Sequence, residues 1–316
     1  MPTGLERSAI LPPAPQVHEH LVLPLPEFAA DYAAQVQLGR YRLRHAKVCF
    51  VGLARDCASA LAGNLSRVLR IAGECESWRL HIEENDSADD TVQVLADFAS
   101  EYRQATFASQ RLGRESYSGE FGGRRTVQLA EYRTACQRWV RENAADCDYV
   151  MAVDFDAWGG WWHDGVLNGI GWMVDLQGAF GMASVSLLEH PSLKQDDRGH
   201  PVVSRSWLHY DCWAARGIGQ PDVYFDDYTR GEGGWKHNWL PPVGSSPVVV
   251  ASAFGGLCIY RTEDYLHAEY DGSSDCEHTS AHRAIAKKTG KRMFVNPSQR
   301  TFMRWMHSCD PPSEGV

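Results

Sequence analysis

Tyr149-Val150-Met151-Ala152-Val153-Asp154-Phe155-Asp156 is the stretch of sequence that decides the fold. Its first five residues form a short apolar run, which is typical of a strand buried on both faces of a sheet. Asp154 and Asp156 follow at once, so the strand should end by presenting two carboxylates at the carboxyl edge of the sheet. Open α/β sheets bind ligands at that edge. A solvated strand end is the alternative meaning of the acidic pair.

The two carboxylates have the chemistry of a divalent metal site. Mg²⁺ and Mn²⁺ prefer hard oxygen ligands and typically take one or two protein carboxylates, with water and substrate phosphates completing the shell. We therefore expect Mn²⁺ or Mg²⁺ at this strand end, bridging to a diphosphate such as that of a sugar nucleotide. Asp156 is the first choice as a direct ligand, and Asp154 should bind the metal, its waters or a ribose.

Composition limits the class of protein. The chain has 316 residues, is 44% hydrophobic and carries a formal charge of −9, which disfavours nucleic acid as a partner. It has no apolar run long enough for a membrane span, no signal-peptide core and nine cysteines without a CxxC pair. We expect a folded cytoplasmic protein with reduced thiols. Without a basic amphipathic anchor, contact with the inner face of the membrane would be at most peripheral.

The pattern along the chain predicts a Pro-rich arm over residues 1–43 and one folded unit over 44–310. In the first half of this unit, strands and helices alternate, which indicates a parallel sheet with right-handed crossovers. The expected strands are 47–53, 78–83 and 149–153, and the expected helices are 58–71, 91–102 and 126–143.

The second half is less regular and richer in aromatic residues. A loop from 189 to 243 is dense in Gly, Pro, Asp and Trp, and a loop of that length usually shapes a binding site. Around it we expect helices 165–176 and 280–289 and strands 183–188, 248–250, 257–260 and 292–295.

Several blocks, taken in order, resemble those of GT-A glycosyltransferases. They are Gly52–Asp56, Glu84–Ser87 with Asp89 and Thr91, Leu129–Arg133 and Asp154–Asp156. More narrowly, the chain resembles the fungal capsule-associated α-1,3-mannosyltransferase family and its bacterial relatives. That likeness rests on Tyr210–Arg216, Ala253–Leu257 and Cys276–His278, with Gly217 standing where an acidic residue is common.

The resemblance covers roughly residues 45 to 300 and implies an α/β fold of the GT-A, Rossmann-like type. A mostly parallel central sheet flanked by helices would carry a nucleotide-sugar half (44–157) and a loop-rich acceptor half (158–310). The implied activity is metal-dependent transfer of a hexose, with retaining mannosyl transfer as the family pattern. The donor would be a nucleoside diphosphate sugar such as a GDP- or UDP-sugar, and the acceptor a saccharide or a lipid-linked glycan.

The resemblance also implies roles for particular residues. The nucleotide sugar would contact Ala54, Arg55, Glu84, Asp86, Arg133 and Asp154, and a downstream histidine, His278, His282 or His307, would complete the metal site. His278 and His282 are four residues apart and would share one face of a helix. For Ser87 and Asp89, a turn that caps the next helix is an equally good interpretation.

Aromatic and acidic residues mark the expected acceptor site. Trp158, Trp161 and Trp162 follow the acidic pair in a Gly-containing loop, where their rings could stack on a sugar, although core packing is the usual fate of tryptophan. Asp211 and Glu277 are the carboxylates best suited to catalysis. One would act as the general base of an inverting enzyme. In a retaining enzyme, Glu277 would orient the acceptor or stabilise the transition state.

Three other functions remain compatible with the sequence. A sugar nucleotidyltransferase should carry a Gly-rich basic loop after the first strand, and Gly52-Leu53-Ala54-Arg55-Asp56 is a poor version of one. A non-catalytic carbohydrate-binding protein on a decayed transferase fold would not need the acidic pair, which is present. A glycoside hydrolase would need two carboxylates flanking the sugar but no nucleotide site.

Overall fold

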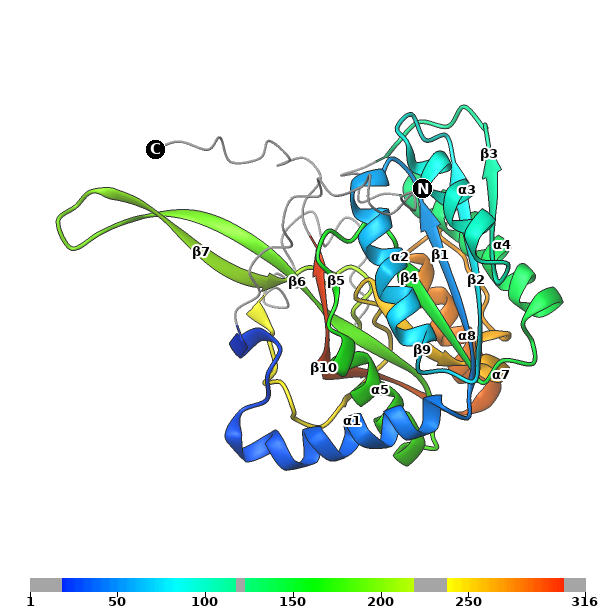
Figure 1. The fold of residues 1–316 in the computed structure, drawn as a ribbon. Coiled ribbons are helices and arrows are strands. Elements are labelled where there is room, and N and C mark those ends of the chain that lie inside the picture. The colour runs from blue at the N-terminus through cyan, green and yellow to red at the C-terminus, as the bar shows by residue number, and fades with distance from the viewer. Residues whose placement is uncertain (1–18, 118–122, 219–237, 304–316) are drawn as a thin grey trace, which may run out of the picture.

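The computed structural model describes residues 19–117, 123–218 and 238–303, and all statements below concern these residues. One mixed sheet forms the centre of the molecule, with its main strands in the order β3-β2-β1-β4-β9-β6-β10-β5. Helices cover both of its faces (Figure 1). The predicted α/β class, with a central sheet flanked by helices, is confirmed.

The first half contains the predicted alternation of strands and helices. Strand β1 pairs with β2 and β4, and β2 pairs with β3, and all three pairs are parallel. The elements are β1 (Lys47–Ala54), α2 (Ala58–Ala72), β2 (Ser77–Asn85), α3 (Thr91–Glu101), β3 (Ala105–Gln110), α4 (Gly123–Asn143) and β4 (Tyr149–Asp154). The sequence analysis missed β3, because this short, half-exposed edge strand lacks an apolar run.

The second half attaches through antiparallel pairs of β9 with β4 and β6. Its elements are β5 (Gly160–Trp161), α5 (His163–Asp175), β6 (Ala179–Gln195), β7 (Pro201–His209), β8 (Val248–Val250), β9 (Leu257–Arg261), α7 (Thr262–Tyr265), α8 (Glu277–Thr289) and β10 (Arg292–Met303). Residues 189–195 and 201–209 of the loop predicted over 189–243 are therefore strand. β6 and β7 form a long antiparallel hairpin that projects from the body of the molecule (Figure 1).

The core lies on both faces of the sheet, because successive side chains of a strand point to opposite sides. In β1, Val48 and Phe50 pack into the cluster under α1, α2 and α5, whereas Cys49 and Val51 pack into the cluster under α4 and α8. Asp154 ends β4 opposite Leu53 of β1, so the acidic pair lies at the carboxyl edge of the parallel strands, as predicted.

Residues before Arg44 differ from the predicted arm. The short 3₁₀ turns η2 (Glu19–Leu21) and η3 (Pro26–Phe28) lead into helix α1 (Ala29–Leu43), which buries Tyr32, Val36 and Leu43 in the core. Gly39 permits this packing, since a Cβ atom there would lie 1.8 Å from the carbonyl oxygen of Leu167 in α5. The Pro-rich segment 11–15 lies outside the described residues.

Among the described residues, no helix combines the length and the apolar character needed to cross a lipid bilayer.

Candidate functional site

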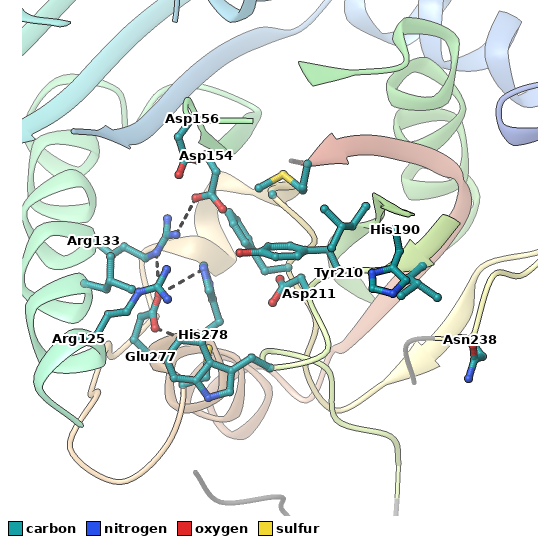
Figure 2. A pocket seen from close by; sticks show the side chains of 18 residues that line it. Arg125, Arg133, Asp154, Asp156, His190, Tyr210, Asp211, Asn238, Glu277 and His278 are labelled. Atoms are coloured by element: carbon teal, nitrogen blue, oxygen red, sulfur yellow. Dashed lines mark hydrogen bonds and ion pairs between the residues drawn. The ribbon is translucent and has the colours of Figure 1, made fainter. Parts of the chain in front are cut away.

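A cavity of about 560 Å³ opens at the carboxyl end of β4. It is bounded by α4, the beginning of α8, the base of the β6–β7 hairpin and the end of β10. Figure 2 shows its charged side chains converging from these separate elements. The charged and ionisable residues on its wall include Arg125, Arg133, Asp154, Asp156, Asp211, Glu277 and His278.

The acidic pair of the sequence forms one end of this cavity. Asp154 and Asp156 both line it, and the side chain of Asp154 is 26% exposed. Burial, together with the negative charge of Asp154, raises the pKa of Asp156 to about 6. A bound cation would stabilise the ionised form of Asp156 beside this neighbouring charge.

Arg133 joins the acidic pair to the other side of the cavity. Its Nη2 donates to Asp154 Oδ1 at 3.0 Å, and its Nε donates to Glu277 Oε1 at 3.0 Å. The guanidinium also lies over the ring of Phe254, 4.7 Å from its centroid. Burial opposes the charge, but the two neighbouring carboxylates keep the pKa of Arg133 well above its usual value. Arg133 is thus a fixed cation in the wall.

His278 follows Glu277 in the first turn of α8 and is 2% exposed. Within the described part of the chain, neither of its ring nitrogens has a hydrogen-bond partner, although Nε2 lies 3.6 Å from Glu277 Oε1 and the ring stacks on Phe254 at 3.9 Å. Burial and the positive charge of Arg133 lower the pKa of His278 well below its usual value. The imidazole is therefore neutral, which is the form that binds metal ions.

His282 lies one turn further along α8, its ring stacked 5.8 Å from that of His278, so the predicted shared face is confirmed. Its suggested role as a metal ligand is wrong. Nδ1 bonds to Ser252 Oγ and Nε2 to Tyr260 Oη, both at 2.8 Å, and the residue is fully buried. His282 is a core histidine with both nitrogens in use. His307 lies outside the described residues.

The two predicted catalytic carboxylates both line the cavity, but they have different hydrogen-bond partners. Glu277 is 2% exposed and is tied to Arg133. Asp211 accepts a hydrogen bond from the backbone N–H of Gly255 at 2.7 Å through Oδ2. Burial raises the pKa of Asp211 to about 6. Asp211 therefore titrates near neutral pH, as a general base should.

Most residues predicted to bind the nucleotide near β1 and β2 are used by the protein itself. Glu84 is 2% exposed and accepts bonds from Ser87 N at 2.8 Å and Ser109 Oγ at 2.5 Å. Asp86 accepts a hydrogen bond from the Asn85 amide at 3.0 Å and three more from the backbone N–H groups of residues 112–114, and these bonds lower its pKa. These bonds fold a loop, so the structure gives both carboxylates a local use, and nucleotide-binding roles for Glu84 and Asp86 stay predictions.

Arg55 takes part in the same loop, since its Nη2 donates to the carbonyl oxygen of Arg114 at 2.9 Å. Ala54 is a buried residue at the end of β1. Neither lines the cavity described here, and their contact with a nucleotide stays a prediction. The alternative given for Asp89 is confirmed, because its carboxylate accepts the N–H groups of Ala58 at 3.0 Å and Thr91 at 2.9 Å.

The predicted aromatic wall lies elsewhere. Trp161 is 5% exposed and belongs to β5, where it pairs with Thr301 of β10 and packs in the core. Trp162 packs against the second core cluster, and Trp158 is not among the lining residues. The turn brings Gly159 so close that a Cβ atom there would lie 2.3 Å from Phe302 Cβ. The pairing of β5 with β10 thus places Trp161 in the core and not in the cavity wall.

Other lining residues were not singled out from the sequence. The indole in the cavity wall is that of Trp213, with the Arg125 guanidinium 5.6 Å from its ring centroid. Arg125 follows a Gly-rich segment at the start of α4, where a basic pair is an ordinary surface feature. His190 and Asn238 lie within the stretch that was predicted to be a loop, so no strand periodicity pointed to them.

The charges of the wall fit a divalent cation shared with a substrate. Four carboxylates, Asp154, Asp156, Asp211 and Glu277, face two guanidinium groups, those of Arg125 and Arg133. No group of three or more His, Cys, Asp or Glu side chains in the described ranges could enclose a metal ion by itself. Mg²⁺ and Mn²⁺ do not need such a cage when substrate phosphates supply ligands. The acidic pair, completed by water and substrate phosphates, fits that kind of site.

Comparison with known proteins gives matches to solved structures alone. No protein-family model matches the chain, and neither does any curated protein. The mannosyltransferase PcManGT from Pyrobaculum calidifontis, solved with GDP-Man and Mn²⁺, is 12% identical with a TM-score of 0.44, over 87% of this chain and 66% of that one. GalNAc-T7 with UDP, GalNAc and Mn²⁺ is 10% identical with a TM-score of 0.48, over 93% and 56%.

A third match, to S. aureus TarS 1-349 in complex with UDP-GlcNAc, has 11% identity and a TM-score of 0.42, over 82% of this chain and 58% of that one. This chain thus spans 56 to 66% of the length of these three solved chains. At such identities and scores, the functional argument rests on the geometry of the cavity.

Proposed function

We propose that this chain is a metal-dependent glycosyltransferase of the GT-A type, which moves a hexose from a nucleoside diphosphate sugar to a hydroxyl group of an acceptor. One observation carries the proposal. Asp154 ends the central strand β4 and Asp156 follows it, in a cavity that also holds two arginines and a histidine whose ring nitrogens make no hydrogen bond. This combination suits a diphosphate bound through a cation.

Each of these groups has a role in the proposal. Asp156 and Asp154 would hold Mn²⁺ or Mg²⁺ together with water and substrate phosphates. We propose that His278 joins them when the ion binds, since the three side chains are not grouped around one point in the ion-free structure. When bound, the cation would neutralise the negative charge that develops on the leaving diphosphate. Arg125 faces the same space, and its planar guanidinium can bind two phosphate oxygens at once.

Asp211 is the proposed general base. Its pKa is raised to about 6, and its side chain faces the cavity. Glu277 suits proton transfer less well, because Arg133 holds it as a buried carboxylate. An Asp211 base supports an inverting transfer, whereas the resemblance to capsule-associated mannosyltransferases supports a retaining mannosyl transfer. The anomeric configuration of the product, read by NMR, distinguishes the two.

The test is a thermal-unfolding panel of GDP, UDP, ADP and CMP, each with and without Mn²⁺. A ligand that binds only the native state raises its apparent stability, by about 2.7 kcal/mol at a hundredfold excess over Kd. We expect one nucleotide to raise the melting temperature only with Mn²⁺, and Asp156→Ala to abolish that shift.

Asp31→Ala is the matched control, since Asp31 is an exposed carboxylate in the first turn of α1. It should leave the shift intact. No shift with any nucleotide at millimolar concentration would refute the proposal and favour a carbohydrate-binding protein without nucleotide chemistry.

A further inference from the structure

Asn64 lies in the middle of α2 and is fully buried. The other buried residues of this helix are all apolar, namely Ala60, Leu61, Leu65, Val68, Ile71 and Ala72. An amide is costly to bury unless it is hydrogen-bonded, whereas an apolar side chain would continue the stripe without this cost. The bonds that Asn64 makes should therefore explain why an amide occupies this position.

The Asn64 side chain spans the turn that carries Asp156. Its Nδ2 donates to the carbonyl oxygen of Phe155 at 2.9 Å and to that of Ala157 at 2.8 Å. These two carbonyl groups belong to the residues on either side of Asp156. Both protons of the amide are thus used on one turn, which is also closed by a bond of 3.3 Å from the N–H of Ala157 to the carbonyl oxygen of Asp154.

The turn divides its side chains between the core and the cavity. Phe155 and Ala157 are buried, whereas Asp154 and Asp156 line the cavity. The carbonyl groups that Asn64 binds belong to the two buried residues. Asn64 thus fixes the backbone on the core side of the turn, and the two carboxylates face the other way.

The carboxylate of Asp156 depends on this turn more than the other carboxylates of the cavity do. Arg133 holds Asp154, and a backbone N–H group holds Asp211. Within the part of the chain that the structure describes, no other residue donates a hydrogen bond to the Asp156 side chain. The backbone of its turn therefore sets where the carboxylate lies.

Gly160 brings the following residues against the same face of α2. Its φ is +60°, and a Cβ atom there would lie 2.6 Å from Asn64 Oδ1 and 2.5 Å from Arg67 Cδ. A methyl group at this position would push both side chains away, so the close approach requires glycine. Gly160 thus offers a way to disturb Asn64 without replacing it.

We infer that Asn64 is a positioning residue for the metal site, which holds the Asp156 carboxylate at the place where the cation binds. The inference rests on the proposed function and deepens it, because it extends the site to a residue of α2 that does not line the cavity. A ligand whose backbone is already fixed loses less conformational freedom when the ion binds. Residues that orient a metal ligand typically contribute roughly 10–100-fold to metal affinity.

The test measures Mn²⁺ affinity in the presence of the nucleotide, from the loss of the free-Mn²⁺ signal in electron paramagnetic resonance. Asn64→Ala should weaken Mn²⁺ binding by roughly 10–100-fold. Asn168→Ala is the matched control, because Asn168 is 1% exposed in α5 and its amide donates to the carbonyl oxygen of Tyr32 at 3.3 Å, away from the cavity. It should lose stability in urea titrations but keep the wild-type affinity.

Gly160→Ala keeps Asn64 and disturbs its position, so it should also weaken Mn²⁺ binding, even if Asn64→Ala does not fold. Gly290→Ala is its control, since Gly290 has a φ of +70° and a Cβ atom there would meet nothing within 4 Å. This control carries the backbone strain alone and should keep the wild-type affinity.

Wild-type affinity in both Asn64→Ala and Gly160→Ala would overturn the inference and leave the proposed function intact. Equal losses of affinity in Asn64→Ala and Asn168→Ala would also overturn it, because general destabilisation would then explain the effect. If the wild type itself shows no Mn²⁺-dependent nucleotide binding, the proposed function is refuted first, and the inference falls with it.

Discussion

Nη2 of Arg133 donates a hydrogen bond of 3.0 Å to Oδ1 of Asp154, which ties the middle of α4 to the carboxyl end of β4. The same guanidinium holds Glu277 at the beginning of α8. Three elements that are distant in sequence thus share one buried cation. The exposed part of Asp154 leaves it able to accept a second partner, whereas Glu277 has no comparable access to solvent.

We expect Arg133→Met to destabilise the protein strongly. It would leave Glu277 as a buried carboxylate without its cation, which typically costs about 3–5 kcal/mol. Adding Glu277→Gln removes the unpaired charge and should restore most of the loss. The free energy of unfolding from urea titrations checks both variants. Arg138→Met, at an exposed position of the same helix, is the control. A single variant as stable as wild type would show that the pair contributes nothing.

The two histidines of α8 predict opposite effects on metal binding. His278→Gln should weaken Mn²⁺ affinity by roughly tenfold or more, about 1.4 kcal/mol, because it removes an imidazole whose nitrogens make no hydrogen bond in the ion-free protein. His282→Gln should leave that affinity unchanged and instead lower stability, because it breaks the bonds to Ser252 and Tyr260. Titration calorimetry with Mn²⁺ and the nucleotide measures the first effect. Equal losses in the two variants would exclude His278 as the specific ligand.

The sequence predicted the parallel half of the sheet and the position of the acidic pair. These follow from local signals, since a buried parallel strand appears as an apolar run and its carboxyl end is a fixed place in the fold. Arg133, Asp211, Glu277 and His278 also converge on the cavity as expected.

The errors have a common physical cause, which is that long-range packing decides what a side chain does. The sequence predicts that Trp161 lies in a loop, but the pairing of β5 with β10 directs its side chain into the core. The sequence suggests that Asp86 is a free carboxylate, but it accepts hydrogen bonds from the backbone N–H groups of residues 112–114, which are distant in sequence.

In the metal-free protein, the contribution of Asp156 to stability should fall as the pH rises from about 4 to 6. A carboxyl whose folded pKa is raised stabilises the protein below its unfolded pKa, near 3.9, and this contribution is lost as the pH passes the folded value. For Asp156 that value is about 6, so the change is on the order of 2–3 kcal/mol.

In the absence of metal, the free energy of unfolding of Asp156→Asn, relative to that of the wild type, should therefore be higher at pH 7 than at pH 4. Urea titrations at both pH values measure the difference, with Asp31→Asn as the exposed control. Saturating Mn²⁺ and nucleotide should reverse the order at pH 7, because only the wild type keeps both carboxylates. A difference that does not change with pH would mean that Asp156 ionises freely.

Asp211→Asn separates a chemical role from a structural one. The amide oxygen can still accept the Gly255 N–H that Asp211 Oδ2 accepts at 2.7 Å, so the local fold should persist. The amide cannot take a proton, so kcat should fall by roughly 10²–10⁴-fold if Asp211 is the base. The Mn²⁺-dependent nucleotide shift should be unchanged, because that shift reports the other side of the cavity.

The pH profile completes this test. In the wild type, kcat/KM should fall below about pH 6, where Asp211 becomes protonated, and the residual activity of Asp211→Asn should lose that limb. Release of the nucleoside diphosphate in the presence of acceptor is the measurement. If Asp211→Asn turns over at the wild-type rate while Asp211→Ala does not, then Asp211 only holds the Gly255 loop. The proton must then leave through another group, and the retaining mechanism gains support.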